Sequence, residues 1–262
     1  AAHRPGSGEA AEAAAGSAAE AAAREVAPET CPNPSGLPYP DFASVPTPCY
    51  VVDEDRLEWN LRILRSVQDR AGCRILLALK GFSMFSVFPL VGRYLAGIAA
   101  SSPFEARLGR EEMGKEVHVY SPAFSDADFD ALLGLCDHIV FNSISQWQRF
   151  GPRVAAANRE SGRARPIECG LRVNPERSVV GTPIYDPCAP GSRLGLVRQG
   201  LDTALAIDPG VLDGLDGLHV HALCEQGVEP LEQVVEAVKA RFGDLLPRMK
   251  WLNLGGGHHI TR

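Results

Sequence analysis

The feature that most constrains this chain is a regular alternation of short apolar runs with stretches of helical period, beginning at Cys49. Between the runs, apolar residues recur on one helical face, as at Leu57, Leu61 and Leu64. Such strand–helix alternation predicts a parallel sheet covered by helices, and this many units favours a β/α barrel over an open, doubly wound sheet. The apolar runs are Cys49–Val52, Ile75–Leu79, Ile98–Ala100, Val117–Tyr120, His138–Phe141, Cys169–Val173, Leu218–His221 and Trp251–Leu254.

Two segments follow from this pattern. Residues 1–46 are rich in Ala and Pro and offer few large apolar side chains to bury, which predicts disorder. Residues 47–262 are expected to form the barrel. That span is shorter than the ~250 residues of a complete eight-unit barrel, and no helix follows the last apolar run. We therefore expect an incomplete barrel that lacks its last strand.

Charge and cysteine usage exclude several classes of protein. The net charge of −6 argues against a nucleic-acid-binding surface. No apolar run approaches the ~20 residues of a membrane-spanning helix, so no membrane insertion is expected. The 7 cysteines are odd in number and contain no C-x-x-C pair, which favours free thiols and a cytoplasmic location over a disulfide or zinc scaffold.

Polar or unusual residues follow nearly every predicted strand. In a β/α barrel these carboxyl ends converge on one mouth, where active sites are built. The sequence therefore predicts one shared site rather than several separate ones. The residues are Lys80, Ser101, Ser102, Ser121, Asn142, Asn174, His221 and Gly255–Gly257.

Lys80 and the three glycines carry the clearest chemistry. A lysine that closes a buried strand is either an ammonium reaching solvent or an amine used covalently, as in a Schiff base. Consecutive glycines at a strand exit can present backbone N–H groups to a phosphate, although a flexible turn would have the same composition. A Walker-type phosphate loop is excluded, because no G-K-[ST] follows Gly255–Gly257.

His219 and His221 alternate on one strand, so both side chains face the same way. They could bind a metal, with Cys224, His258 or His259 as a third ligand. Alternatively, one imidazole stacks on a flat aromatic cofactor while the other packs in the barrel. The second interpretation is favoured, and no metal ligand is predicted.

Three further charged residues have a functional and a structural interpretation. Arg172 lies in a buried strand and needs an anionic or polar partner. Glu105 completes a capping box with Ser102 and could be only that. Arg193 lies in a long Pro- and Gly-rich loop, where it could bind a substrate carboxylate or remain solvated.

Nine sequence stretches together resemble the alanine-racemase-like, fold type III pyridoxal-phosphate enzymes, and among them the carboxynorspermidine decarboxylases. The resemblance runs from about residue 47 to the end of the chain. The matching stretches are TPCYVVDEDRLEWNL (47–61), ILLALKGFSM (75–84), AASSPFEARLG (99–109), EVHVYSPAF (116–124), DHIVFNSISQW (137–147), GLRVNPE (170–176), DPCAPGSRLG (186–195), GLHVHALCEQ (217–226) and MKWLNLGGGHHIT (249–261).

The resemblance implies roles for individual residues. Lys80 corresponds to the lysine that carries pyridoxal 5′-phosphate, and His221 to the histidine stacked on the cofactor ring. The remaining cofactor-lining positions, and two candidate substrate contacts, are implied by the same comparison of motifs. The cofactor-lining positions are Ser102, Glu105, Arg172, Cys224, Gly255, Gly256 and Gly257, and the substrate contacts are Arg193 and Glu225.

The resemblance also implies an activity for the complete protein. It is the decarboxylation of carboxynorspermidine or carboxyspermidine to norspermidine or spermidine in polyamine biosynthesis, by a homodimer. Such enzymes continue into an eighth strand and a C-terminal β-domain, so this chain alone is expected to be inactive. The alternatives are a diaminopimelate-like decarboxylase, a non-catalytic cofactor-binding fragment, or a metal-dependent barrel hydrolase that uses His219 and His221.

Overall fold

The structure of the protein is a computed structural model that describes residues 41–160, 162 and 165–259. By their internal contacts these residues divide into two units, which meet at Cys73 and Arg74 in the sequence. Most of the predicted disordered segment, residues 1–46, lies outside the described residues, and its disorder stays a prediction. No helix in the described part of the chain is both long and apolar enough to cross a bilayer.

The first unit contains a 3₁₀ turn, η3 (Phe42–Ser44), and the long helix α2 (Glu54–Ala71). Asp53 caps α2: its carboxylate accepts a hydrogen bond from the N–H of Arg56 at 3.1 Å. Gly72, in the left-handed conformation with φ 62°, ends the helix. The helix predicted from Leu57, Leu61 and Leu64 is thus confirmed, and Leu61 is its buried member of the three.

The strand predicted at Cys49–Val52 was wrong, because these residues belong to none of the strands that the structure describes. An apolar run forms a strand only where a neighbouring strand can take up its backbone hydrogen bonds. In the second unit each strand finds that neighbour in the next strand of the chain.

The second unit is built on a sheet of seven parallel strands whose spatial order equals their order in the sequence. An open, doubly wound sheet would reverse strand order at a switch point, so the sequential order identifies the barrel type of winding, with one strand fewer than eight. The strands lie within two residues of their predicted bounds. They are β1 (Leu76–Ala78), β2 (Gly97–Ala100), β3 (Glu116–Tyr120), β4 (His138–Phe141), β5 (Glu168–Arg172), β6 (Gly217–His219) and β7 (Trp251–Asn253).

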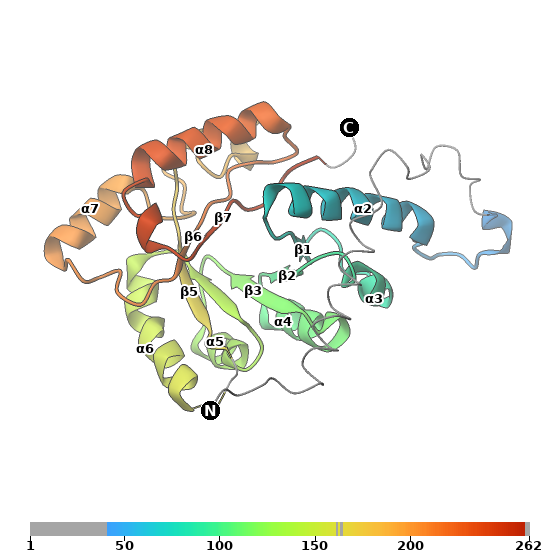
Figure 1. Ribbon diagram of the computed structural model, residues 1–262, viewed down its shortest axis with the longest axis horizontal. Helices are drawn as coiled ribbons and strands as arrows, with labels where there is room; N and C mark the ends of the chain where they lie inside the picture. Colours follow the sequence, from blue (N-terminus) through green and yellow to red (C-terminus); the bar gives the residue numbers. More distant parts are fainter. Residues whose placement is uncertain (1–40, 161, 163–164, 260–262) are drawn as a thin grey trace, which may run out of the picture. The chain divides into compact units, whose positions relative to one another are not determined.

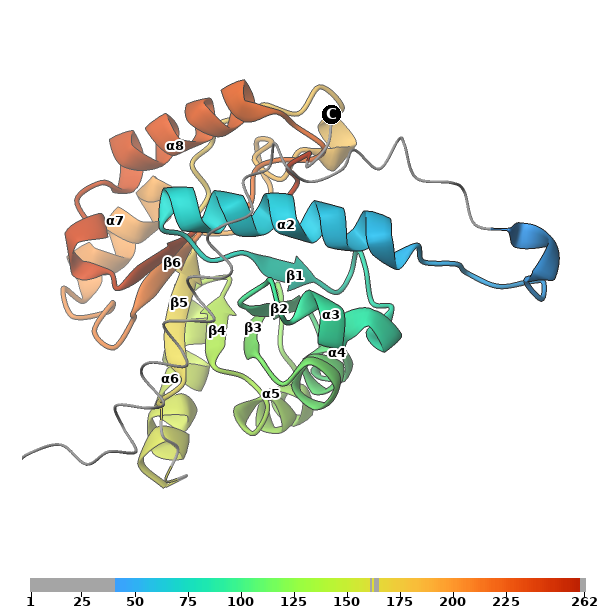
Figure 2. The same ribbon diagram turned by 45° about the vertical axis from the view of Figure 1, so that its right-hand side comes forward.

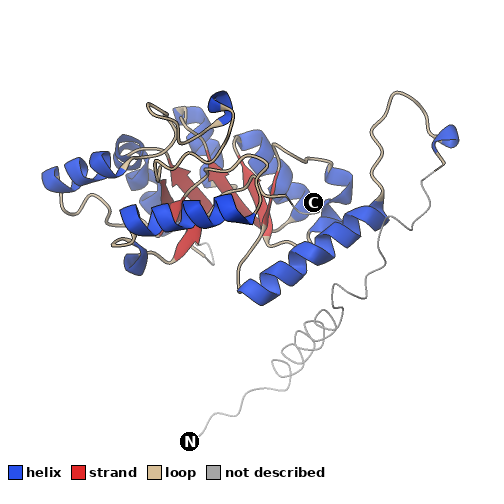
Figure 3. Ribbon diagram, turned by 90° about the horizontal axis from the view of Figure 1, so that it is seen from above, coloured by secondary structure: helices blue, strands red, loops and turns tan. Residues whose placement is uncertain are grey.

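Helices and short turns connect the strands. Figures 1 and 2 show α4, α5 and α6 along the outer side of β2–β5, with α7 and α8 beside β6, and Figure 3 shows the strands of this unit among its helices. The helices are α3 (Phe88–Val91), α4 (Pro103–Leu108), α5 (Asp126–Leu133), α6 (Ile144–Glu160), α7 (Arg198–Ile207) and α8 (Val228–Phe242), and the turns are η4 (Phe85–Val87), the π-helical η5 (Gly109–Met113), η6 (Pro183–Tyr185) and η7 (Leu246–Arg248).

The core of the second unit lies between the sheet and its helices. On β3, Val117 and Val119 are fully buried and pack in one cluster with Phe129 of α5. The alternate residue Tyr120 contacts residues of other strands, His219 and Arg172. Because side chains alternate along a strand, one face of the sheet makes the core while the other carries the polar residues described next.

Candidate active site at the carboxyl ends of the strands

Lys80 follows β1, at one edge of the sheet. Its side chain is exposed, and none of the described residues forms a hydrogen bond or ion pair with it. Its positive charge nevertheless contributes to lowering the pKa of His219 and of His221, which belong to β6 and its exit near the other edge. The sheet therefore curves enough to bring Lys80 into electrostatic range of these histidines.

His221 is held in one protonation state. The N–H of Gly256 donates a hydrogen bond to His221 Nδ1 at 3.1 Å, so the single proton of the neutral ring lies on Nε2. Burial lowers the pKa of His221 to about 4, and the charges of Lys80 and Arg172 contribute. At neutral pH the site thus contains an uncharged imidazole of fixed tautomer.

Arg172 is 4% exposed at the end of β5. Its guanidinium donates a hydrogen bond to the carbonyl of His221 at 3.0 Å and lies over the ring of Tyr120, 4.7 Å from its centroid. No carboxylate among the described residues pairs with it. A buried cation without an anion is costly, which makes this position suitable for an anionic ligand.

His219 is also buried, and its Nδ1 has no hydrogen-bond partner in the structure. Burial, followed by the charge of Arg172, keeps the pKa of His219 well below its usual value. The ring centroids of His219 and His221 are 6.5 Å apart, and no third histidine, cysteine or carboxylate of the described chain joins them as a metal-binding group. The described residues thus do not supply the ligand set of the hydrolase alternative.

The glycine loop after β7 packs against the segment that follows β6. Gly255 and Gly257 have φ of 72° and 91°, a conformation that favours glycine. A Cβ on Gly255 would lie 2.5 Å from the carbonyl oxygen of Val220, and one on Gly257 would collide with the carbonyl of Leu223. These glycines are therefore required for close approach and do not form merely a flexible turn.

The N–H groups of this loop are only partly engaged. Gly255 donates to Asn253 Oδ1 at 2.8 Å and Gly256 donates to His221. For the N–H of Gly257, no acceptor is found among the described residues. One backbone donor at the strand exit is thus available to an anion beside His221.

Tyr120 lies at this end but was not among the predicted site residues, and it contacts Asn142, which was predicted only as a polar residue after a strand. Tyr120 Oη donates a hydrogen bond to Asn142 Oδ1 at 2.8 Å, and the same oxygen accepts one from the N–H of Gly195 at 2.8 Å. Burial raises the pKa of Tyr120. These bonds join β3 and β4 to the long loop before α7. Both residues end strands, which was the available signal, but their pairing depends on the register between strands.

Comparison with known proteins shows which proteins this chain is similar to. No protein-family profile matches the chain. Carboxyaminopropylagmatine decarboxylase of Synechocystis sp. is 43% identical over 225 residues, which are 86% of this chain and 54% of that protein. Carboxynorspermidine/carboxyspermidine decarboxylase of Campylobacter jejuni is 38% identical over 221 residues, 84% of this chain and 54% of that protein.

A solved structure agrees with the sequence comparison. Carboxynorspermidine decarboxylase from Campylobacter jejuni, in complex with norspermidine, superimposes with a TM-score of 0.70 at 37% identity. The match covers 83% of this chain and 52% of that one. The chain is homologous to the carboxynorspermidine decarboxylases. It spans about half the length of the curated relatives it matches.

The decarboxylase resemblance also assigned Ser102 and Glu105 to the site, but the structure gives them a local role. Ser102 Oγ accepts the N–H of Glu105 at 3.3 Å, and the Glu105 carboxylate accepts the N–H and hydroxyl of Ser101 at 2.6 and 2.8 Å. The predicted capping of α4 by the Ser102 side chain is confirmed, but the Glu105 carboxylate accepts from Ser101 and not from the Ser102 N–H of a regular capping box. Among the described residues, neither Ser102 nor Glu105 contacts His221 or the glycine loop, so their cofactor role stays a prediction.

The remaining predicted residues lie at the same end of the strands but are exposed. Cys224 accepts a hydrogen bond from Gln226 Nε2 through its carbonyl at 2.9 Å, and Glu225 has a φ of 51°. Arg193 is placed by its backbone, since its carbonyl accepts from Asn142 Nδ2 at 2.9 Å. The contacts of their side chains with a substrate stay predictions.

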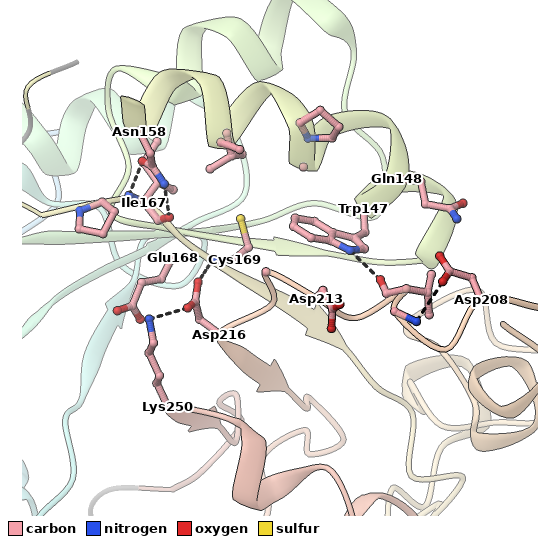
Figure 4. Close-up of a pocket in the computed structure, with 18 residues that line it drawn as sticks. Trp147, Gln148, Asn158, Ile167, Glu168, Cys169, Asp208, Asp213, Asp216 and Lys250 are labelled. Carbon is pink, nitrogen blue, oxygen red and sulfur yellow. Dashed lines mark hydrogen bonds and ion pairs between the residues drawn. The ribbon is translucent and has the colours of Figure 1, made fainter. Parts of the chain in front are cut away.

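A cavity of about 550 Å³ lies elsewhere, between α6, the start of β5 and the segment before β6. Figure 4 shows Trp147, Cys169 and Lys250 among its lining, with the Lys250 ammonium paired to Asp216 at 2.7 Å. Its lining contains none of the predicted site residues, so it is separate from the candidate site at the carboxyl ends of the strands.

Proposed function

We propose that this chain supplies the cofactor-binding barrel of a pyridoxal-phosphate-dependent decarboxylase of carboxylated polyamines. The observation that supports it most is the combination, at one end of the sheet, of the fixed neutral imidazole of His221 with Lys80 and Arg172, two cations that pair with no carboxylate of the described residues. The homology to named decarboxylases at 43% and 38% identity supports the same reaction class.

The residues present fit pyridoxal phosphate on three counts. Its phosphate needs cations and backbone donors, which Arg172 and the N–H of Gly257 offer. Its aldehyde needs an amine, and Lys80 has no competing carboxylate partner among the described residues. Its ring needs a polar contact within a buried wall, and His219 Nδ1 is a buried nitrogen without a partner.

Each residue then has a distinct task. Lys80 provides the amine that attaches the cofactor covalently. His221, fixed by Gly256, offers a flat uncharged face, while Arg172 balances negative charge. The glycine loop fixes the position of the phosphate. When bound, the cofactor supplies a sink for the electron pair left by the departing carboxylate.

Binding can be tested directly by titrating the chain with pyridoxal phosphate and following absorbance and fluorescence. We expect saturable covalent binding that Lys80→Ala abolishes. Lys115→Ala, which changes an exposed lysine after η5, is the matched control and should bind as the unaltered chain does. Equal covalent binding by Lys80→Ala would contradict the proposal.

The substrate proposed is carboxynorspermidine or carboxyspermidine, giving norspermidine or spermidine. Carboxyaminopropylagmatine is a second candidate, because the 43% identical relative is named for that substrate. Release of CO₂ from each of these compounds and from diaminopimelate distinguishes them. Preference for diaminopimelate would support the amino-acid decarboxylase alternative, and binding without any turnover would support a non-catalytic cofactor-binding protein.

A homodimer in the cytoplasm is part of the same proposal. The charge and cysteine usage of the sequence support the location, and the resemblance supports the dimer. Sedimentation of the protein with and without pyridoxal phosphate tests the dimer, and a monomer in both conditions would contradict it.

A further inference from the structure

A second polar cluster lies at the opposite, amino-terminal ends of β3, β4 and β5. Glu116 and His118 are two residues apart on β3, so both face the same side of the sheet. His118 is paired in register with His138 of β4, and His138 is paired with Glu168 of β5. The sheet register thus places two imidazoles and two carboxylates together.

The first three residues are close enough to share an ion. One ligand atom each from Glu116, His118 and His138 lies within 4.8 Å of the other two. The two imidazole rings stack with centroids 3.8 Å apart, and His118 Nε2 lies 3.3 Å from Glu116 Oε2. All three residues are half-buried, which protects them from solvent but leaves access for an ion.

One ring nitrogen of His138 is buried and has no hydrogen-bond partner in the structure. Its Nε2 lies 3.4 Å from Glu168 Oε2, whereas its buried Nδ1 has no hydrogen-bond partner. A proton on Nε2, directed at Glu168, leaves the Nδ1 lone pair free to bind an ion. Metal-binding histidines commonly have this arrangement, with a carboxylate on the other nitrogen.

We propose that Glu116, His118 and His138 bind a divalent transition-metal ion, zinc in the first instance, and that Glu168 positions His138. Two imidazoles and a carboxylate suit zinc, while magnesium and calcium prefer oxygen ligands alone. Zinc–ligand bonds of about 2.1 Å place tetrahedral ligands about 3.4 Å apart. Binding therefore requires the imidazoles to turn and the ligand atoms, now within 4.8 Å of one another, to approach by up to about 1.4 Å.

The surrounding cations determine how tightly the ion binds. Arg74 Nη2 pairs with Glu116 Oε1 at 2.6 Å, and Arg165 Nη1 lies 3.8 Å from the same oxygen. On the other side, Lys250 lies near Glu168, as Figure 4 shows. Arg74 competes directly with the metal for Glu116, so removing its charge should increase metal affinity.

Glu116 and His138 begin β3 and β4, whereas Lys80 follows the carboxyl end of β1, so the ion is assigned a structural role. It would join β3 to β4 directly and β5 through Glu168. A ligand that binds only the folded chain raises its melting temperature.

The test is calorimetric titration of the metal-free full chain, without a polyhistidine tag, with zinc chloride. We expect one ion per chain, loss of binding in His118→Asn and His138→Asn, and unchanged binding in the control His259→Asn. Glu168→Ala should weaken binding by about 10–100-fold, as loss of an outer carboxylate does. Arg74→Ala should strengthen it several-fold.

X-ray absorption of the zinc-loaded, unaltered chain keeps the proposal testable even if a variant fails to fold. Two imidazole nitrogens and a carboxylate oxygen around zinc are expected, with a higher melting temperature than the metal-free chain. The proposal is overturned by an absence of stoichiometric zinc. It is equally overturned by zinc that remains in both histidine variants, in which case the cluster is an ion-pair network.

Discussion

At the scale of single residues, the candidate site depends on how closely the glycine loop approaches His221. Gly255 and Gly256 are neighbours in that loop but differ in the space available for a side chain. A Cβ on Gly255 would lie 2.5 Å from the carbonyl of Val220 and 2.8 Å from His221 Nδ1, whereas one on Gly256 would have its nearest neighbour at 4.0 Å. The two positions therefore form a matched pair.

Gly255→Ala should destabilise the chain by about 1–3 kcal/mol, because it adds a clash to an unfavourable positive φ. Gly256→Ala should change the free energy of unfolding by less than about 0.5 kcal/mol. Urea unfolding followed by circular dichroism measures both. Equal stabilities of the two variants would show that the loop does not pack against His221 as described.

Arg172 allows a second test at this scale, since it is a buried cation that pairs with no described carboxylate. Arg172→Met keeps a long apolar side chain over Tyr120 and removes the charge. We expect the free energy of unfolding of the cofactor-free chain to change by less than about 1 kcal/mol, because such replacements are often neutral. Affinity for pyridoxal phosphate should fall about tenfold, as the loss of about 1.4 kcal/mol implies.

These two measurements separate the possible roles of Arg172. A large loss of stability with unchanged cofactor affinity would mean that Arg172 is a structural residue and has no anionic ligand.

Single-residue patterns in the sequence predicted part of the candidate site. Lys80, Arg172 and His221 could be predicted because each follows or ends a buried apolar run. A polar or charged side chain is costly at such a place unless it has a partner or a ligand. The hydrogen bond from Tyr120 to Asn142 and the stacking of His118 on His138 could not be predicted. Both depend on which residues of neighbouring strands are paired. A shift of the strand register by one residue would move every side chain of the shifted strand to the other face of the sheet.

At the scale of elements, the strands were predictable because parallel strands buried on both faces are nearly continuous apolar runs. The exception, Cys49–Val52, shows that an apolar run alone does not make a strand when no neighbour accepts its backbone bonds. The start of α4 was predictable for a different reason. Its Ser102 and Glu105 interact within one turn, so their hydrogen bonds do not depend on the rest of the fold.

Ser102→Ala should remove the side-chain acceptor for the N–H of Glu105 and destabilise the chain by about 0.5–2 kcal/mol. Ser178→Ala, in an exposed part of the loop before α7, is the control and should have no measurable effect. Thermal or urea unfolding gives both values. If the two variants unfold alike, the cap does not contribute to stability.

At the scale of the whole molecule, the buried imidazole of His219 and the half-buried imidazoles of His138 and His221 make stability depend on pH. Burial lowers the pKa of His138 and of His221 to about 4, and that of His219 well below its usual value. Below the unfolded pKa of about 6.5, the unfolded chain therefore binds more protons than the folded chain. Stability conferred by these groups is present above that pH and is lost as the pH falls towards 4.

The free energy of unfolding should accordingly fall between pH 7 and pH 5, with up to about 1.4 kcal/mol per pH unit from each histidine. Urea titrations of the metal-free chain at several pH values measure this slope. His221→Gln should reduce the slope by about one proton. A stability that is constant from pH 7 to pH 5 would show that the histidines are exposed in the folded chain.

The proposed cofactor chemistry depends on the amine of Lys80. The most direct test is to incubate the protein with pyridoxal phosphate, reduce it with borohydride and map the adduct by peptide mass spectrometry. We expect a single stoichiometric adduct on the peptide that contains Lys80, and none in Lys80→Ala. An adduct on another lysine, or no adduct at all, would contradict it.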